Sequence, residues 1–288
     1  MSQRTKAEIA LAIAAIVWGS TFVVVKDALR DVSPVLFLAI RFGIAALLIA
    51  PLLLFGPRPT PRVFLGGVAT GGLLGFGMIL QTVGLKYTSA ANSGFLTSLY
   101  IPLVPFVAAF VYGDRTGWRE RIAVAVASLG IALMSFDPAS LTINLGDMLT
   151  IGCAIVFSFQ IVMVKHFASA SGFVWLAWLQ IAVTAIIAAC GAGLGVAGPE
   201  FVKWTPRLLW ALAITIAGAT VLAFLLQSWG QRHTTASRAA LVFATEPVFA
   251  GLASYFWLGE RFTLSGWVGA ALVFIAIILA EMKPRAQS

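Results

Sequence analysis

Two charged residues, Glu246 and Arg41, stand inside long apolar runs of the sequence. Glu246 lies ten residues beyond Ala236, which begins one of these runs, and is followed by Pro247. An ionisable side chain is costly to bury among apolar residues and usually binds a charged ligand or carries a proton. Glu246 could therefore bind a substrate ammonium or relay protons. Alternatively, Arg41 stands at nearly the same depth of another run, so the two side chains could form a structural ion pair, or each could make a hydrogen bond that fixes a helix.

Aromatic and polar side chains at similar depth in other runs extend this candidate site. Trp18 and Thr21 share one helix face at a spacing of three, as do Phe157 and Gln160. Aromatic rings can hold an apolar side chain and face an ammonium, so such a pocket suits an apolar or aromatic amino acid. Each ring taken alone could equally be a packing residue. The predicted substrate-binding residues are Trp18, Thr21, Met78, Gln81, Tyr100, Phe157, Gln160 and Glu246.

The composition indicates which elements must position these residues. The 288-residue chain is 60% hydrophobic and 10% charged, whereas a soluble domain is about 25% charged. So few charges cannot coat a water-soluble globule, and the chain is predicted to be an all-α integral membrane protein. The apolar runs, too long for barrel strands, predict ten helices: Ala7 to Leu29, Pro34 to Phe55, Arg62 to Lys86, Ser89 to Tyr112, Arg119 to Phe136, Gly146 to Phe167, Phe173 to Gly195, Arg207 to Trp229, Ala236 to Leu258 and Leu264 to Glu281.

The basic residues between the runs predict the orientation. With both termini in the cytoplasm, Lys and Arg on the cytoplasmic side outnumber those outside by about two to one. We therefore expect a multi-pass protein of a bacterial-type inner membrane with both ends inside. The first run is longer than the core of a signal peptide, so we expect it to be retained as a helix.

The two halves of the chain resemble each other. A shift of 139 residues places Trp18 on Phe157, Lys26 on Lys165 and Arg41 on Gln180. A shift of 146 places Gln81 on Gln227, Gly84 on Gly230 and Tyr100 on Glu246. Each half holds five spans, an odd number, so the second copy must be inverted in the membrane. We expect repeats at residues 1–137 and 138–288, an architecture that lets a central site face the two sides alternately.

Several segments are similar to a known family. The run Thr234 to Ala240, then Glu246-Pro247-Val248-Phe249 and Leu258-Gly259-Glu260-Arg261, resembles the second repeat of EamA-type transporters of the drug/metabolite transporter superfamily. The first repeat carries Trp18-Gly19-Ser20-Thr21-Phe22 and Gly113-Asp114. The resemblance spans nearly the whole chain. It implies a secondary carrier of ten helices in two inverted repeats, with a cavity between the first four helices of each half, exporting amino acids, other metabolites or drugs.

Proline and glycine residues suggest where the helices bend. Pro102, Pro105 and Pro247 each remove a backbone hydrogen bond and are predicted hinges. Ile101 stands where the second repeat has Pro247, so the fourth span is expected to kink one residue later than the ninth. The glycine-rich third span could slide or could simply pack closely.

Other classes of protein are disfavoured by what the sequence lacks. It shows no HExxH pattern, no nucleophile elbow and no Walker A loop, which argues against an enzyme, a metal site or a nucleotide-driven pump. No cofactor, nucleic acid or obligate protein partner is indicated. A phosphorylated substrate would need several cavity cations, and only Arg41 lies deep. The sequence thus predicts an amino-acid exporter with a small-molecule substrate in a lipid bilayer; the alternative is an exporter of drugs or cationic amphipathic compounds.

Overall fold

A computed structural model of the chain describes residues 1–135, 144–168, 172–259 and 264–281. Every regular element in these ranges is helical. The first repeat comprises α1 Gln3–Ala28, α2 Pro34–Ile49 with a 3₁₀ extension Ala50–Phe55, α3 Pro61–Tyr87, α4 Ala90–Thr97, α5 Tyr100–Tyr112 and α6 Trp118–Ser135. The second comprises α7 Leu145–Phe167, α8 Phe173–Gly193, α9 Pro206–Ile214, a π-helix Thr215–Leu222, α10 Ala223–Gln231, α11 Ala236–Phe243, α12 Glu246–Leu258 and α13 Leu264–Glu281.

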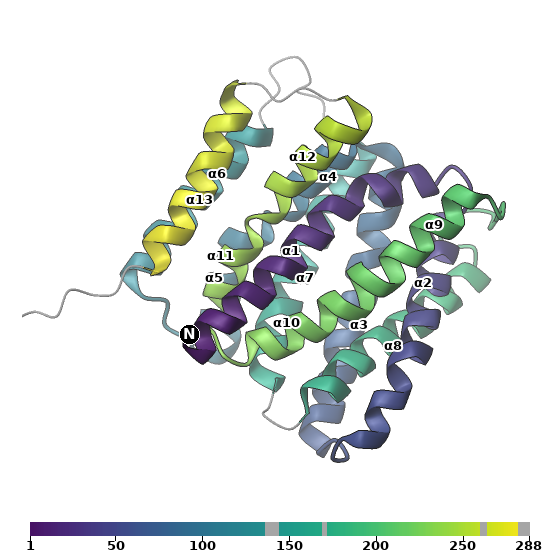
Figure 1. Cartoon of the computed structure of the whole chain (residues 1–288), viewed down its shortest axis with the longest axis horizontal. Coiled ribbons are helices and arrows are strands. Elements are labelled where there is room, and N and C mark those ends of the chain that lie inside the picture. The colour runs from purple at the N-terminus through teal and green to yellow at the C-terminus, as the bar shows by residue number, and fades with distance from the viewer. Residues whose placement is uncertain (136–143, 169–171, 260–263, 282–288) are drawn as a thin grey trace, which may run out of the picture.

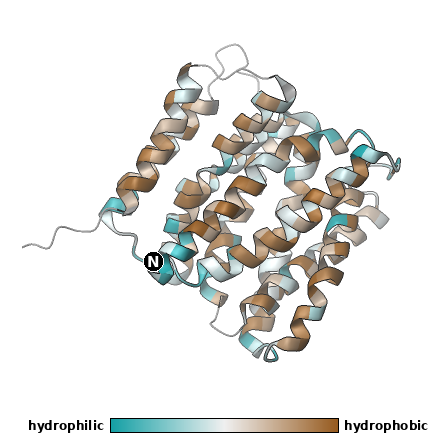
Figure 2. Cartoon of the chain, viewed as in Figure 1, coloured by the Kyte–Doolittle hydropathy of each residue, from teal (hydrophilic) through white to brown (hydrophobic). Residues whose placement is uncertain are grey.

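These elements form the ten predicted spans. Eight continuous or broken helices in the described ranges are long and apolar enough to cross a membrane, and Leu264–Ala280 is a shorter apolar helix. The tenth is α6, which begins with charged residues. Figure 2 shows hydrophobic residues along the helices and hydrophilic ones concentrated near their ends. The expected boundary between residues 137 and 138 lies outside the described residues.

Local sequence explains where many helices begin. The side chains of Ser2, Thr60, Ser89, Thr205 and Thr235 each accept a hydrogen bond from a backbone N–H in the first turn of the following helix. Such caps satisfy donors that have no partner inside the helix. Span ends are therefore readable from sequence to within a few residues.

The two halves interlock through their first helices. We call the end of the bundle at which α1 begins the N-terminal face, and the opposite end the distal face. Helix α1 packs against α10, α11 and α12, and its repeat mate α7 packs against α3, α4 and α5. The last helices of the two halves, α6 and α13, pack on each other at one flank of the molecule (Figure 1).

Two spans are broken at equivalent positions. The fourth consists of α4 and α5, and the ninth of α11 and α12, with the breaks at Ser98-Leu99 and Ala244-Thr245. A shift of 146 residues superimposes these breaks, so the expectation of a kink one residue later in the fourth span is wrong. The reason is that the first N–H groups of a helix need no partner, so Pro102 and Pro247 fit the first turn at slightly different places. Pro105 lies inside α5.

The glycines of α3 allow close packing. A Cβ atom added at Gly66, Gly67 or Gly71 would lie 2.3, 2.6 or 2.8 Å from a side-chain atom of α7 or α8. These distances favour the packing interpretation over sliding contacts, because the neighbouring helices already occupy the space.

Candidate functional site

A central cavity lies between the two halves and is bordered by residues of the first four spans of the first half and of the first, third and fourth spans of the second half. It brings together all eight predicted substrate-binding residues. Its other lining residues, which were not in the predicted set, are Phe22, Val25, Arg41, Leu74, Thr82, Leu85, Ile161, Phe224, Gln227 and Phe243. Neither α6 nor α13 contributes to this list.

Glu246 and Tyr100, which are repeat mates, meet at the centre of the cavity wall. Each is the first residue of a helix that follows a break, α12 and α5 respectively. The Tyr100 hydroxyl donates to Glu246 Oε2 at 3.0 Å. Glu246 is 5% exposed, and among the described residues no hydrogen bond to its second oxygen, Oε1, is seen. The start of a helix favours negative charge, and the cavity thus presents one carboxylate oxygen to a donor.

Arg41 borders the same cavity but is held by a different partner. Its Nε donates to Thr220 Oγ1 at 2.7 Å and its Nη2 to the carbonyl of Ala219 at 3.2 Å. Both acceptors belong to the π-helix in the eighth span, whose altered bonding pattern makes Ala219 O available. The described residues show no ion pair between Arg41 and Glu246; Arg41 instead makes hydrogen bonds that hold α2 against the eighth span.

Aromatic rings form part of the wall of the cavity that Glu246 and Arg41 border. Trp18 Nε1 donates to Ala219 O at 2.9 Å, and this bond fixes the indole. The ring centroid of Trp18 lies 5.4 Å from that of Phe224 and 5.4 Å from that of Phe243. Such tilted pairs are favourable arrangements of aromatic rings. The result is an apolar surface with the Glu246 carboxylate nearby.

The remaining predicted residues differ in how they are held. The Thr21 hydroxyl donates to the backbone of its own helix, at Trp18 O. Gln81 donates to Thr97, which ends α4. Gln160 donates to Gln180 on α8 at 2.7 Å. Met78 and Phe157 contribute apolar surface.

Sequence reasoning missed Gln227 and the two phenylalanines of the aromatic wall. Gln227 is the repeat mate of Gln81, which was predicted, so the repeat alone contained the signal that would have found it. Phe224 is likewise the repeat mate of Met78, which was also predicted. Phe243 carried no such signal, because isolated phenylalanines are common throughout an apolar chain.

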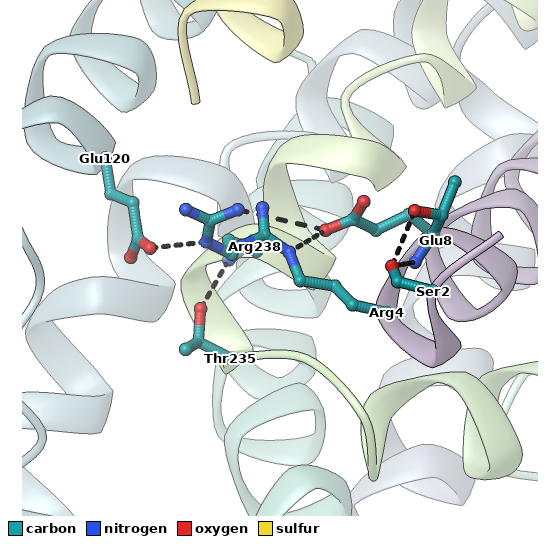
Figure 3. A network of polar contacts seen from close by, with 7 residues as sticks. Ser2, Arg4, Glu8, Glu120, Thr235 and Arg238 are labelled. Carbon is teal, nitrogen blue, oxygen red and sulfur yellow. Dashed lines mark hydrogen bonds and ion pairs between the residues drawn. The ribbon is translucent and has the colours of Figure 1, made fainter. Parts of the chain in front are cut away.

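The N-terminal face carries a network of charges (Figure 3). Arg238 on α11 donates to Glu120 on α6 at 2.6 Å and lies 3.9 Å from Glu8 on α1. Arg4 also donates to Glu8, at 2.9 Å. These contacts tie α1, α6 and α11 together. Arg238 lies in the first turn of α11 and is not among the residues that line the cavity.

The distal face is joined by a second set of polar contacts. Arg207, at the start of α9, makes two 2.8 Å hydrogen bonds to Asp31, in the connection between α1 and α2. Hydrogen bonds from Arg207 and then Thr205 lower the pKa of Asp31 to about 2. Next to these residues, Val32 and Val202 form an isolated antiparallel β-bridge between the two connecting segments.

Lys26 and Lys165, which are repeat mates, donate hydrogen bonds to carbonyls at helix ends on opposite faces. At the distal face, Lys26 donates to the carbonyls of Leu85, Lys86 and Thr88, at 2.6, 3.2 and 2.8 Å. At the N-terminal face, Lys165 donates to the carbonyl of Arg232 at 3.2 Å. Lys86 and Arg232 are themselves repeat mates. A cation at the C-terminal end of a helix satisfies free carbonyls and complements the helix dipole.

The titratable and thiol side chains in the described part of the chain differ from the arrangements that hold metal ions. Within the described ranges, no group of three or more His, Cys, Asp or Glu side chains could hold a metal ion. Of the two free cysteines, Cys153 is buried and Cys190 is exposed. The chemistry available in the cavity is that of binding, through one carboxylate, one guanidinium, several amides and aromatic rings.

Comparison with known proteins agrees with this architecture. Residues 5–136 and 144–282 each match the EamA-like transporter family. An uncharacterized transporter from Archaeoglobus fulgidus is 35% identical over 281 residues, covering 98% of this chain and 87% of that protein. A probable amino-acid metabolite efflux pump of Escherichia coli is 28% identical over 149 residues, 48% of this chain and 46% of that protein. A solved crystal structure matches with a TM-score of 0.76 at 21% identity, covering 96% of both chains, and shows the same fold.

Proposed function

The chain belongs to the EamA-like transporter family, and we propose that it is a secondary exporter of apolar or aromatic amino acids, working by alternating access through the central cavity. The observation that carries this proposal is the free Oε1 of Glu246 beside the aromatic wall of Trp18, Phe224 and Phe243. A carboxylate oxygen suits the substrate ammonium, and the rings suit its side chain.

Arg41 favours a zwitterion over an amphipathic cation. A cationic drug would gain the Glu246 carboxylate and the rings, but it would be repelled by the guanidinium that borders the same cavity. An amino acid adds a carboxylate, which a guanidinium attracts. Export of cationic compounds is therefore the second candidate, and a phosphorylated substrate fits less well because Arg41 is the one cation among the lining residues.

We also propose a membrane orientation and hinge positions for this chain. The excess of Lys and Arg on the N-terminal face supports a cytoplasmic location of both termini in an inner membrane. The breaks before Tyr100 and Glu246 support hinge roles for Pro102, Pro105 and Pro247, because bending concentrates where backbone hydrogen bonds are missing. No step of the proposed transport needs a cofactor or a second protein.

A competition panel in proteoliposomes tests the substrate class. Uptake of labelled phenylalanine is measured with excess unlabelled apolar amino acid, amphipathic cation or sugar phosphate. We expect the apolar amino acids to compete and the other two classes to leave uptake unchanged. Competition by the cation, with none by amino acids, would make the drug-export alternative the better function.

Variants of the wall connect uptake to the cavity. Trp18→Ala and Tyr100→Ala are expected to lower uptake while the purified protein stays monodisperse. Normal uptake in both would return these residues to a packing role. Glu246→Gln tests proton coupling, because it keeps the shape of the side chain but cannot ionise. A pH dependence of uptake equal to that of the unmodified protein would exclude Glu246 as the proton carrier.

A further inference from the structure

The inverted repeat allows the two sides of the cavity to be compared residue by residue. Residues that border the cavity on its distal side include Thr21, Phe22, Val25, Arg41, Gln81, Thr82 and Leu85. The repeat shifts of 139 and 146 residues place them on Gln160, Ile161, Val164, Gln180, Gln227, Ser228 and Gln231, in that order. All seven mates lie in the halves of α7, α8 and α10 nearer the N-terminal face.

The two sides differ in accessibility. Of the seven mates, Gln160, Ile161 and Gln227 border the cavity and the other four do not. Arg41 is 4% exposed where Gln180 is 0%, and Val25 is 7% exposed where Val164 is 0%. The cavity therefore extends toward the distal face and is shut toward the N-terminal face.

A chain of amide hydrogen bonds lies where the cavity is shut. Gln227 donates to Gln160 at 3.4 Å, Gln160 to Gln180 at 2.7 Å, and Gln180 to Ser228 at 3.3 Å. Gln231 donates to the carbonyl of Ile161 at 2.9 Å. These bonds join α7, α8 and α10, three helices that must separate if the cavity is to reach the N-terminal face.

On the distal side the equivalent residues bond elsewhere. Thr21 bonds its own helix, Gln81 bonds Thr97, and Arg41 bonds the π-helix. Among the described residues, Thr21, Arg41 and Gln81 form no hydrogen bonds with one another, although Lys26 ties α1 to the end of α3 farther out at the distal face. The same structural positions are thus joined on one side and apart on the other, as expected for a transporter with one side closed.

We propose that the amide cluster, made of Gln160, Gln180, Gln227, Ser228 and Gln231, is the gate that closes the cavity toward the N-terminal face, and that in the opposite state its freed amides line an uncharged subsite for the polar end of the substrate. This inference rests on the proposed alternating access. The carbonyl oxygens of Gln227 and Gln231 support the subsite, because both are buried without a partner in the described structure. A buried acceptor without a partner is costly, and opening the cluster would give both oxygens a donor.

Two valines at matched positions can report the state of the gate. Val25 and Val164 are repeat mates on the open and shut sides, and neither takes part in the amide chain. Each is replaced by cysteine after Cys153→Ala and Cys190→Ala remove the native thiols. Labelling by a membrane-impermeant maleimide is then measured from each side of sealed vesicles of known orientation, with no substrate present.

The perturbation is Gln180→Leu, which keeps the size of the side chain but removes two links of the chain. We expect V164C labelling from the N-terminal face to rise about fivefold to tenfold, and V25C labelling from the distal face to fall. Gln81→Leu is the matched control, since Gln81 bonds only within the first repeat, and it should leave the ratio of the two labelling rates unchanged. If Gln180→Leu is not recovered from membranes, Gln160→Met breaks the same chain.

Three outcomes would overturn the gate. V164C could react as fast as V25C before any change, Gln180→Leu could alter neither rate, or both rates could rise together as they would in a loosened fold. Because labelling requires no substrate, failure of the gate is distinct from failure of the competition panel. Intact amino-acid uptake with unchanged labelling would remove the gate and leave the proposed function.

Discussion

Gly19 stands where α1 crosses α12, one residue after Trp18 and directly against the residue that presents the cavity carboxylate. A Cβ atom added at Gly19 would lie 2.3 Å from the carbonyl oxygen of Glu246, 3.0 Å from Phe249 Cβ and 3.1 Å from Ala250 N. An ordinary carbon-to-oxygen approach is about 3.3 Å or more. Because two of these three atoms are backbone, no change of side-chain rotamer relieves the clash, and Gly19→Ala must push the helices apart by about 1 Å.

The expected cost has two parts. Overpacking of a close contact costs about 1 to 3 kcal/mol, which corresponds to a fall of several degrees in Tm for a chain of this size. A shift of about 1 Å at the start of α12 also lengthens the 3.0 Å bond between Tyr100 and Glu246 beyond hydrogen-bonding distance. Loss of a hydrogen bond to a charged group costs about 1.5 kcal/mol, or about a tenfold fall in substrate affinity where that group binds the substrate.

The assay combines thermal unfolding of the purified protein with uptake in proteoliposomes. Gly72→Ala is the matched control, because a Cβ atom at Gly72 meets nothing within 4 Å. Gly218→Ala is a second control, with its nearest neighbour at an ordinary 3.4 Å. Both should retain Tm and uptake. The close-approach argument is refuted if Gly19→Ala matches these controls in both measurements.

The remaining predictions concern hydrogen bonds seen at the cavity and the two faces. Tyr100→Phe keeps the ring but removes the hydrogen bond to Glu246, so the apparent affinity for the substrate in uptake should fall about tenfold with little change in Tm. An unchanged affinity would contradict a role of Tyr100 in positioning the carboxylate. Asp31→Asn should lower Tm at pH 7, and the difference in Tm from the unmodified protein should shrink as the pH falls from about 4 toward 2. The reason is that the pKa of Asp31 is about 2 in the folded state and 3.8 when unperturbed, so its charge stabilises the fold above pH 3.8 and this stabilisation is lost as the pH falls through about 2. A difference in Tm that is independent of pH would argue against a role of the charge. Lys26→Met should lower Tm more than Lys165→Met, since it leaves three carbonyls without a donor rather than one, and equal deficits would show that these bonds contribute little.

The spans were predictable because their ends are marked in the sequence by local chemistry. The expected starts at Phe173 and Ala236 coincide with the observed ones, and Ser89 proved to be the cap of the helix it was expected to begin. The breaks in the fourth and ninth spans were misplaced relative to each other, because a proline tolerates any of the first helical positions and so does not fix where the preceding helix ends.

The cavity was predictable only in part. Depth in a span and the repeat located the eight candidates, but depth alone could not separate an ion pair between Arg41 and Glu246 from two charges with different partners. The deciding feature is the π-helix at Thr215–Leu222, which supplies the acceptors for Arg41. Its sequence holds small residues that also occur in regular helices, so its presence depends on tertiary packing that local sequence patterns do not reveal.

The comparison of repeat mates separates positions that hold the fold from positions that distinguish its two sides. Repeat mates Lys26 and Lys165 are both lysines. Lys26 donates to the carbonyl of Lys86 and Lys165 to the carbonyl of Arg232, the repeat mate of Lys86, so the same interaction occurs once in each half. Arg41 and Gln180, and Tyr100 and Glu246, carry a charge in only one member of each pair. A perfectly symmetric carrier would offer a substrate the same groups from both sides. Because these unequal pairs meet at or beside the cavity, a zwitterion would contact different partners when the cavity faces different sides, and its affinity for the two states would differ by the difference between those contacts.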